Sequence, residues 1–328
     1  MNKKPKLLVV GSLVMDLIVS TSVFPNAGET VIGKAFSTAP GGKGANQAVQ
    51  AARLGADVTM VGMVGDDDFG KRLRESARES GVNTTWLFTT EKASSAVGNV
   101  QIQENESGTE NRIIVVPGAN YVLSVEDVAF LKDHIAEYDM VILQLEIDMA
   151  VNCFVAAIAS EAGVPVLLNP APSAVIPEEL LKNLTYICPN EHEAEDITGI
   201  TPADEASVTA ASSALQAMGV QNVLITLGRE GSFYNDGTLC HHCGVVDGIT
   251  AVDPTAAGDS FIGAFCTAVA AGIQPESAMR FANCTAGITV SRMGAQPSLP
   301  TLSEVLHLMK EKGYDTEPYQ ILKGEAGE

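Results

Sequence analysis

The chain has 328 residues, of which 46% are hydrophobic and 18% are charged. This composition is typical of a folded protein and excludes an intrinsically disordered chain. The length predicts about two domains, or one large α/β domain with an addition. Asp and Glu (40) outnumber Lys and Arg (20), and the net charge is −20. Because nucleic acids and anionic membrane surfaces bind clustered cations, this charge argues against both partners. It does not exclude a small anionic ligand, because backbone dipoles act locally.

The sequence predicts neither a membrane anchor nor structural disulfides. No uninterrupted run of about 18 apolar residues occurs, so we expect no transmembrane helix. Residues 1–15 loosely resemble a signal peptide, but Gly11, Ser12 and Asp16 interrupt the apolar run, and we interpret it as a buried strand. A chain of this size needs no disulfides, and its six cysteines lie mostly in apolar segments. This pattern favours a reducing cytoplasm.

Short apolar runs alternate with longer amphipathic segments along the chain. We expect strands at 6–10, 58–64, 140–145, 165–168, 186–188 and 223–227. We expect helices at 45–54, 69–80, 150–162, 191–197, 206–218, 256–271, 275–292 and 301–312. Strands that alternate with helices form right-handed βαβ units. The order therefore predicts a three-layer αβα fold, in which helices cover both faces of a doubly wound, mostly parallel sheet.

Two segments, 29–38 and 96–116, have strand-like patterns with no helix to accompany them. The near-alternation of apolar and polar residues after position 96 indicates a half-exposed sheet. We therefore expect 15–38 and 96–116 to form a small, discontinuous β lid. The main domain would comprise 1–14, 39–95 and 117–313, and the polar tail 314–328 is expected to be loosely ordered.

The first candidate binding motif is GGKGANQ, residues 41–47. Paired glycines permit positive φ and a close approach of ligand to backbone, and the amides of the following helix can bind hydroxyls or an anion. A Walker A loop is excluded, because Gly44 follows Lys43 where Ser or Thr is required. The same pattern is also compatible with a simple glycine-rich turn before a helix.

The second candidate is DPTAAGDSF, residues 253–261, which leads into an apolar helix. Its small residues leave the amides of Ala256, Ala257, Gly258 and Asp259 uncovered, and such a helix start stabilises negative charge. A carboxylate in the first turn, that of Asp259, can take a proton from a nearby hydroxyl. The alternative is that Asp259 only complements the helix dipole.

Two weaker motifs follow predicted strands. Asn190 and Glu193 share one helix face, and oxygen ligands of this kind suit Mg²⁺, which usually keeps several waters. A helix N-cap with acidic first-turn residues explains the same pattern. The segment 226–231 is a strand end that opens into a glycine turn, a weak signal by itself.

The run Cys240-His241-His242-Cys243 resembles a metal cluster. In a strand, however, alternation sends Cys240 and His242 to one face and the other two residues to the opposite face. No second pair stands at zinc-finger spacing, so the sequence does not favour a metal site here.

Together, these motifs resemble the ribokinase-type (PfkB) family of carbohydrate kinases. The match runs from Gly11 to Ser298 and rests on five motifs in the family's order: 41–47, 169–172 (NPAP), Asn190-x-x-Glu193, 256–259 and 294–298 (GAQPS). The resemblance implies an αβα domain with a small β lid. It also implies ATP-dependent phosphorylation of a sugar, here the 5-hydroxyl of a free pentose, D-ribose.

Residue by residue, the resemblance also assigns the roles within such a site. The sugar would be held by Asp16, Gly42, Lys43, Asn46 and Glu146. Asp259 would be the catalytic base, beside an anion hole of amides from Ala256, Ala257 and Gly258. ATP would be bordered by Asn190, Thr226, Gly228, Gly231, Gly258 and Asn283. Glu193 would hold Mg²⁺ through water. A K⁺ ion would be bound, partly through backbone carbonyls, by Asp253, Thr255, Thr289, Arg292, Gly294 and Ser298.

Two positions depart from the family pattern. Members usually carry Asn two residues before Asp16, where this chain has Val14, which cannot hydrogen-bond a sugar hydroxyl. A site that lacks one polar contact discriminates less against a sugar that lacks the hydroxyl. The sequence therefore suggests a weakened or inverted preference for ribose over 2-deoxyribose. Pro254 replaces the usual Thr, but it precedes the anion hole, so we expect little loss.

Other functions stay open at this stage. A nucleoside kinase, a kinase of another sugar, and a catalytically silent sugar sensor share the same fold. A periplasmic sugar-binding protein is disfavoured, because its signal peptide is missing. The lid resembles one that pairs across a homodimer in ribokinases, so a homodimer is expected, with sugar and ATP as small-molecule partners.

Overall fold

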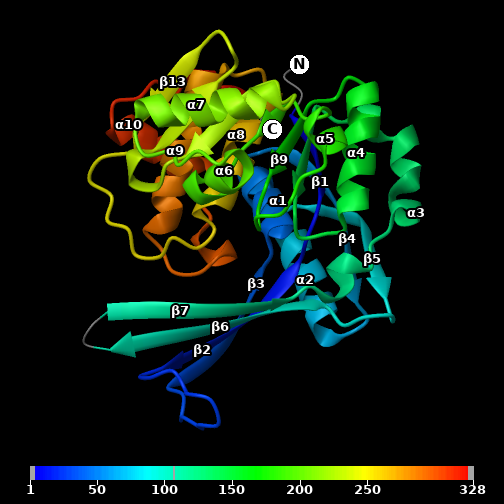
Figure 1. Cartoon of the computed structure of the whole chain (residues 1–328), viewed down its shortest axis with the longest axis vertical. Helices are drawn as coiled ribbons and strands as arrows, with labels where there is room; N and C mark the ends of the chain where they lie inside the picture. The colour runs from blue at the N-terminus through cyan, green and yellow to red at the C-terminus, as the bar shows by residue number, and fades with distance from the viewer. Residues whose placement is uncertain (1–3, 106–107, 324–328) are drawn as a thin grey trace, which may run out of the picture.

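A computed structural model describes residues 4–105 and 108–323 (Figure 1). Within these residues the larger sheet has nine strands in the order β13-β12-β11-β10-β9-β8-β1-β4-β5. All neighbours pair in parallel except β11–β12 and β12–β13. The strands are β1 (Lys6–Val10), β4 (Asp57–Gly65), β5 (Asn83–Thr90), β8 (Met140–Gln144), β9 (Val166–Asn169), β10 (Tyr186–Ile187), β11 (Asn222–Thr226), β12 (Ser232–Asn235) and β13 (Cys240–Cys243). The predicted mostly parallel sheet is confirmed.

Helices cover both faces of this sheet, because its strands are apolar on both sides. In β1, Leu7 and Val9 belong to one buried cluster and Leu8 and Val10 to the other. The first cluster packs against α1 (Lys43–Arg53), α2 (Asp68–Glu79), α8 (Ala257–Ala270), α9 (Pro275–Val290) and α10 (Leu302–Glu311). The second packs against α3 (Val125–Val128), α4 (Met149–Glu161), α5 (Glu178–Leu181), α6 (Glu191–Thr198) and α7 (Glu205–Ala217). The three-layer αβα prediction is confirmed.

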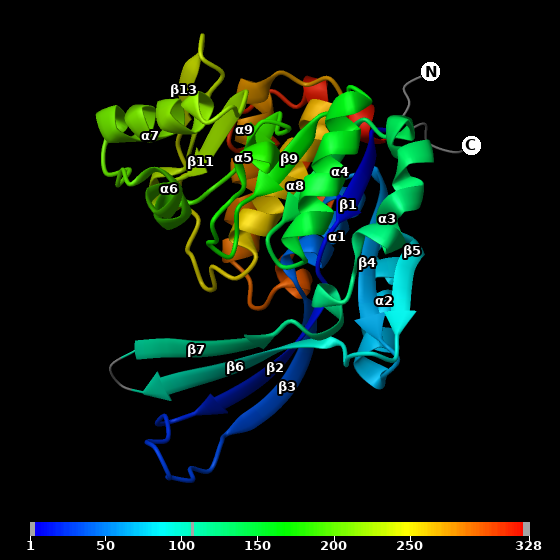
Figure 2. The same cartoon turned by 45° about the vertical axis from the view of Figure 1, so that its right-hand side comes forward.

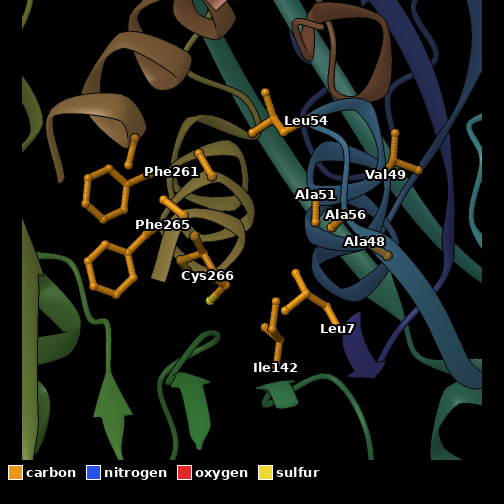
Figure 3. Packing of buried hydrophobic residues seen from close by; sticks show 14 of the residues in the cluster. Leu7, Ala48, Val49, Ala51, Leu54, Ala56, Ile142, Phe261, Phe265 and Cys266 are labelled. Atoms are coloured by element: carbon orange, nitrogen blue, oxygen red, sulfur yellow. The ribbon is translucent and has the colours of Figure 1, made fainter. Parts of the chain in front are cut away.

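Helices α1 and α8 lie side by side on the first face, and their contact positions the site described below. Figure 3 shows Ala48 and Ala51 of α1 across from Cys266 of α8, with Leu7 and Ile142 rising from the sheet. A Cβ added at Gly263 of α8 would lie 2.9 Å from Gln47 O. The small residues therefore let the two helix backbones approach closely.

A second sheet of four strands projects from the main domain (Figure 2). Its order is β3-β2-β6-β7, from β3 (Ala35–Gly41), β2 (Val14–Thr21), β6 (Ala96–Asn105) and β7 (Gly108–Val116). The strand pattern expected at 29–38 is wrong for residues 29–34, which lie outside the strands. The sequence places residues 15–38 in the lid but does not locate the strand at 14–21, because Asp16 interrupts its apolar pattern.

The tail prediction is wrong for residues 314–323. They end in a 3₁₀ helix (Glu317–Lys323), where Tyr319 stacks on Phe281 with 4.8 Å between ring centroids and donates to Ser277 O at 2.9 Å. Leu322 is also buried. These two apolar side chains dock an otherwise polar segment, and residues 324–328 lie outside the described residues. No helix formed by residues 4–105 or 108–323 has the length and apolarity needed to cross a bilayer.

Candidate active site

A cavity of about 200 Å³ lies where β9 and β11 end. The carboxyl edge of a parallel sheet is where ligands bind in such folds. The cavity brings together residues of the segments 41–47, 169–172, 190–193, 226–231 and 253–261, which are far apart in the chain. Its lining consists of Lys43, Asn169, Cys188, Asn190, Glu193, Thr226, Pro254, Ala256, Ala257, Gly258, Asp259 and Ile262.

Helix α8 begins at this cavity in a strained conformation. Its N-cap, Ala256, has φ of 60°, in the left-handed region that disfavours residues with a Cβ. The first-turn amides of Gly258 and Asp259 have no carbonyl one turn earlier to bond. A Cβ added at Gly258 would meet no described atom within 4 Å, so the space beside this first turn is open. The amide of Ala257 is not uncovered, contrary to the sequence prediction, because it donates to Pro254 O at 3.1 Å.

The Asp259 carboxylate is held from helix α1. Asn46 Nδ2 donates to Asp259 Oδ2 at 2.9 Å, and Gln47 Nε2 donates to Oδ1 at 3.0 Å. The side chain is 7% exposed and lines the cavity. The structure thus places Asn46 and Asp259 together, as predicted, with the carboxylate beside the open end of α8.

Lys43 supplies the positive charge of the cavity. Burial lowers the pKa of Lys43, but the negative charges of Asp259, Glu146 and Glu193 together raise it above its ordinary value. The ammonium group is therefore charged at neutral pH, within reach of three carboxylates. It is suited to meet the phosphate groups of a ligand.

The residues predicted to bind a sugar lie next to Lys43. Lys43 N donates to Glu146 Oε2 at 3.0 Å, and Ser12 Oγ donates to the same oxygen. Burial, with the charge of Glu146 as a second cause, raises the pKa of Asp16 from 3.8 to about 6. Gly42 has φ of 92°, and a Cβ there would lie only 2.8 Å from Val14 N.

Ser12 was not singled out from the sequence. It contacts Glu146 across 134 residues of chain, and Gly44 N donates to Ser12 Oγ at 3.2 Å. No motif signals such a long-range contact. Asn120, also missed, fixes the backbone before Val14: Leu13 N donates to its Oδ1 at 3.1 Å, and its Nδ2 donates to Leu13 O at 3.0 Å.

Asn190 and Glu193 act as a helix cap and also line the cavity. Asn190 Oδ1 accepts from Glu193 N at 2.8 Å, and Glu193 Oε2 accepts from Asn190 N at 2.9 Å, a capping box for α6. Burial is the main cause that raises the pKa of Glu193. Within residues 4–105 and 108–323, no group of three or more His, Cys, Asp or Glu is placed to hold a metal ion. Glu193 lines the cavity, and a carboxylate is a ligand type that suits Mg²⁺, which usually keeps several waters.

On the predicted nucleotide side, only Asn190, Thr226 and Gly258 reach the cavity lining. Gly228 and Gly231, with φ of 49° and 98°, shape the turn after Thr226. Asn283 is not brought to the cavity, because its Nδ2 donates to Cys243 O at 2.7 Å and its Oδ1 accepts from Ser232 Oγ at 3.3 Å. Asn283 ties α9 to β12 and β13.

The predicted K⁺ residues come from the loop before α8, from the end of α9 and from the segment that follows it, and Asp253 joins the first of these to the last. Thr255 N and Thr255 Oγ1 donate to Asp253 Oδ1 at 2.9 and 2.6 Å, and Gly294 N donates to Oδ2 at 2.8 Å. Although burial opposes it, these hydrogen bonds hold the pKa of Asp253 below its ordinary value. The carboxylate is therefore charged at neutral pH, as a cation site requires.

The other predicted K⁺ residues use their side chains elsewhere. Thr289 Oγ1 donates to Thr285 O at 3.1 Å, and Ser298 Oγ donates to Ala295 O at 2.7 Å. The Arg292 guanidinium pairs with Glu304 at 2.6 Å. Only the backbone carbonyls of these three residues remain as possible ligands, and that of Thr289 already accepts from Arg292 N at 3.1 Å.

The Cys-His-His-Cys run forms β13. Cys240 and His242 are exposed while Cys243 is buried, which is the alternation that the sequence predicts. The cysteines of the run face opposite sides of the strand and do not converge on one ion.

The family model described as "pfkB family carbohydrate kinase" matches residues 4–302. The chain belongs to this family. This carbohydrate kinase is 38% identical over 306 residues to a ribokinase of Haemophilus influenzae, covering 93% of the chain and 98% of the relative. It is 34% identical over 302 residues to a deoxyribokinase of Salmonella typhi, covering 90% and 96%.

Solved structures agree with the family assignment. A structure of Arabidopsis thaliana ribokinase complexed with ribose and ATP superposes with a TM-score of 0.87 at 33% identity, covering 94% of this kinase and 99% of that chain. The resemblance to the family and the ribokinase-like fold with a separate small sheet are thereby confirmed.

Proposed function

We propose that this kinase transfers the γ-phosphoryl group of ATP to the 5-hydroxyl of free D-ribose, with Asp259 as the base. One observation carries the proposal: the buried Asp259 carboxylate lies at the cavity beside both the open start of α8 and the Lys43 ammonium. The similarity to ribokinases, one of them in complex with ribose and ATP, supports ribose as the acceptor.

The proposed reaction needs positioning and charge neutralisation more than covalent help. Asp259 takes the proton of the sugar hydroxyl while the hydroxyl oxygen bonds to the γ-phosphorus. The bond between the γ-phosphorus and the oxygen that stays with ADP breaks. The amides of Gly258 and Asp259 and the Lys43 ammonium meet the charge on the transferred group. Mg²⁺, bound with ATP and held by Glu193 through water, would neutralise further phosphate charge.

Polar groups around Asp259 offer partners for the sugar hydroxyls. Asn46 Oδ1 is buried and has no hydrogen-bond partner among the described residues, so it is free to accept from a hydroxyl. The carboxylates of Asp16 and Glu146 supply further acceptors, close enough that the charge of Glu146 affects Asp16. These groups would orient the 5-hydroxyl toward Asp259.

We also propose a K⁺ ion between the loops that Asp253 joins. Carboxylate and carbonyl oxygens suit such a cation, and its role would be to fix the loop before α8. A cation held by Asp253 would act on the conformation of this loop and would not take part in phosphoryl transfer.

The lid is proposed to pair across a homodimer. Both faces of β7 are open in the single chain, because Ile113, Ile114, Val115 and Val116 are each 49% to 64% exposed, and Phe36 of β3 is 67% exposed. So large an apolar surface indicates a partner. We propose a second copy of this chain in a reducing cytoplasm.

The test is the Asp259→Asn variant. Asn keeps the shape of the side chain but cannot take a proton, so kcat is expected to fall about 10²–10⁴-fold. Calorimetric ribose binding should be retained. Near-normal kcat in a coupled ADP assay would remove Asp259 from the base role. Ribose binding by the wild-type protein without any pentose-dependent ADP release would instead favour a sugar sensor.

A second candidate, a 2-deoxyribose kinase, is favoured by Val14. Val14 and Asp16 lie on one face of β2: a Cβ at Gly98 would meet Asp16 Oδ1 and lie 3.7 Å from Val14 Cγ1. The apolar side chain thus stands beside a carboxylate that the proposal assigns to the sugar. Measuring kcat/KM for ribose and for 2-deoxyribose distinguishes the two candidates. A preference for ribose above about a thousandfold contradicts the 2-deoxyribose kinase.

A further inference from the structure

We propose that Gln47 and Gln144 form a relay that positions Asp259 for catalysis. The inference rests on the proposed role of Asp259 as the base. Gln47 and Gln144 are both 0% exposed and are separated by 97 residues of chain. Because neither side chain is accessible to a ligand, they are positioning residues and not catalytic ones.

The relay runs from β8 through α1 to α8. Gln144 Nε2 donates to Gln47 Oε1 at 2.7 Å. Gln47 Nε2 in turn donates to Asp259 Oδ1 at 3.0 Å and to Asn169 Oδ1 at 3.2 Å. Gln144 is itself held, because Asn152 Nδ2 donates to its backbone oxygen at 2.8 Å. The side-chain amide of Gln47 therefore links the base, Asp259, to Asn169 at the end of β9.

The charge of Asp259 dictates the direction of every step in the relay. A carboxylate only accepts, so Gln47 must present Nε2 to it and turn Oε1 toward Gln144. Gln144 must then present its own Nε2, which leaves Gln144 Oε1 buried. That oxygen has no hydrogen-bond partner in the part of the chain that the structure describes. A buried orphaned acceptor is unfavourable and calls for an explanation, which the ionised base supplies.

Two glycines reserve the space that Gln144 needs. A Cβ at Gly11 would collide with Gln144 Oε1, and a Cβ at Gly44 would lie 2.9 Å from the same atom. Gly44 lies in the first turn of α1 and Gly11 directly follows β1. The glycine pattern of the 41–47 motif thus accommodates a side chain from β8 as well as a ligand.

The relay complements the contact made by Asn46. Asn46 fixes Asp259 Oδ2 from the sugar side, and Gln47 fixes Oδ1 from the protein interior. Two donors, one on each oxygen, define the plane of the carboxylate. Loss of the interior donor should let the carboxylate turn, which impairs proton transfer without removing a sugar contact.

The experiment compares three Gln→Met variants, which conserve volume and delete one amide each. Gln47→Met should lower kcat about 10–100-fold, the loss expected for a hydrogen bond to a charged group, with KM and Kd for ribose within about threefold of wild type. Gln144→Met should lower kcat less, about 3–10-fold. The double variant should resemble Gln47→Met, because Gln144 acts through Gln47.

Gln50→Met is the matched control. Gln50 lies on α1, is equally buried, and donates from Nε2 to Pro300 O at 2.9 Å. Like Gln144, it has a buried Oε1 without a partner among the described residues. This variant measures the effect of losing a buried side-chain amide outside the relay. We expect its Tm to fall and its kcat to stay within about twofold of the wild-type value.

A fourth variant, Gln47→Glu, adds a pH readout. At low pH the new carboxyl group is protonated and can donate to Asp259, whereas at higher pH two like charges share the site. The kcat ratio of variant to wild type should therefore fall as pH rises. A structural role alone would give a constant ratio. This variant and Gln144→Met still decide the matter if Gln47→Met fails to fold.

The relay is refuted if Gln47→Met or Gln144→Met folds and keeps kcat at the level of Gln50→Met. It is also refuted if kcat losses add in the double variant, or if the Gln47→Glu ratio does not change with pH. If Asp259→Asn is inactive in the same assays, such a result leaves the proposed function intact. Near-normal kcat in Asp259→Asn overturns the base role, and the relay with it.

Discussion

Replacing Asp16 with Asn is expected to stabilise the fold at neutral pH while it impairs catalysis. Burial and the charge of Glu146 raise the pKa of Asp16 from 3.8 to about 6. The folded protein therefore binds this proton more tightly than the unfolded chain does. At pH 7.5 the ionised side chain destabilises the fold by about 3 kcal/mol, and Asn removes both the charge and its repulsion from Glu146.

The pH dependence has a defined sign. Below about pH 3.8 Asp16 is protonated in both states, so the variant gains nothing there. The gain grows between pH 3.8 and about 6 and is constant above. In a chain of this size, about 3 kcal/mol corresponds to a Tm increase of roughly 4–6 °C. Because Asn offers one acceptor fewer to the sugar, KM for ribose should rise about 10–100-fold.

Thermal unfolding at pH 7.5, 5.5 and 4, with coupled kinase assays at pH 7.5, measures both effects. Asp67→Asn is the control, because Asp67 caps α2 and accepts from Gly70 N and Ser95 N, each at 2.7 Å. Burial raises the pKa of Asp67, but these hydrogen bonds hold it below its ordinary value, so the same substitution should destabilise at pH 7.5. The reasoning is refuted if Asp16→Asn is less stable than wild type at pH 7.5, or equally stabilised at pH 4 and 7.5.

Three further outcomes are expected. Val14→Asn should raise the ratio of kcat/KM for ribose over 2-deoxyribose about 10-fold or more, and an unchanged ratio would exclude position 14 as the determinant. Ile114→Glu should shift sedimentation from dimer to monomer, because it places charge on the exposed apolar strand β7; a wild-type monomer would contradict pairing through the lid. K⁺ should activate turnover more than Na⁺ does, and Asp253→Asn should abolish the difference; indifference of wild type to both ions would refute the cation site.

Local patterns predicted the sheet well, because its strands are short apolar runs buried on both faces. The segment 6–10 was predicted with the observed ends, since Lys6 precedes the apolar run and a polar or small residue follows Val10. The start of α8 was also predictable, because a run of small residues before an apolar segment is typical of a helix start that leaves its amides uncovered. The segment of β2 was assigned to the lid, but the strand itself was not located, since Asp16 interrupts its apolar pattern.

What sequence reasoning missed depends on contacts between distant residues. Gln144 lies within the apolar run predicted as the strand 140–145, and only the fold brings it to Gln47. Asn283 carries a role by resemblance, yet its amide closes β13 onto α9. The Ala257 amide was missed for a local reason, since its hydrogen bond to Pro254 O depends on how tightly the loop turns.

The departures from local stability rules gather around one carboxylate. Ala256 adopts a positive φ that glycine would adopt without strain, and Gln144 leaves an oxygen without a partner among the described residues. Each feature is unfavourable by itself, and selection for stability alone would replace it with glycine, an apolar residue or a smaller one. A methyl group at position 256 restricts the backbone where the following amides must point. Ala256 caps the helix that carries Asp259, and Gln144 reaches Asp259 through Gln47, so we infer that both features serve the geometry that this residue requires.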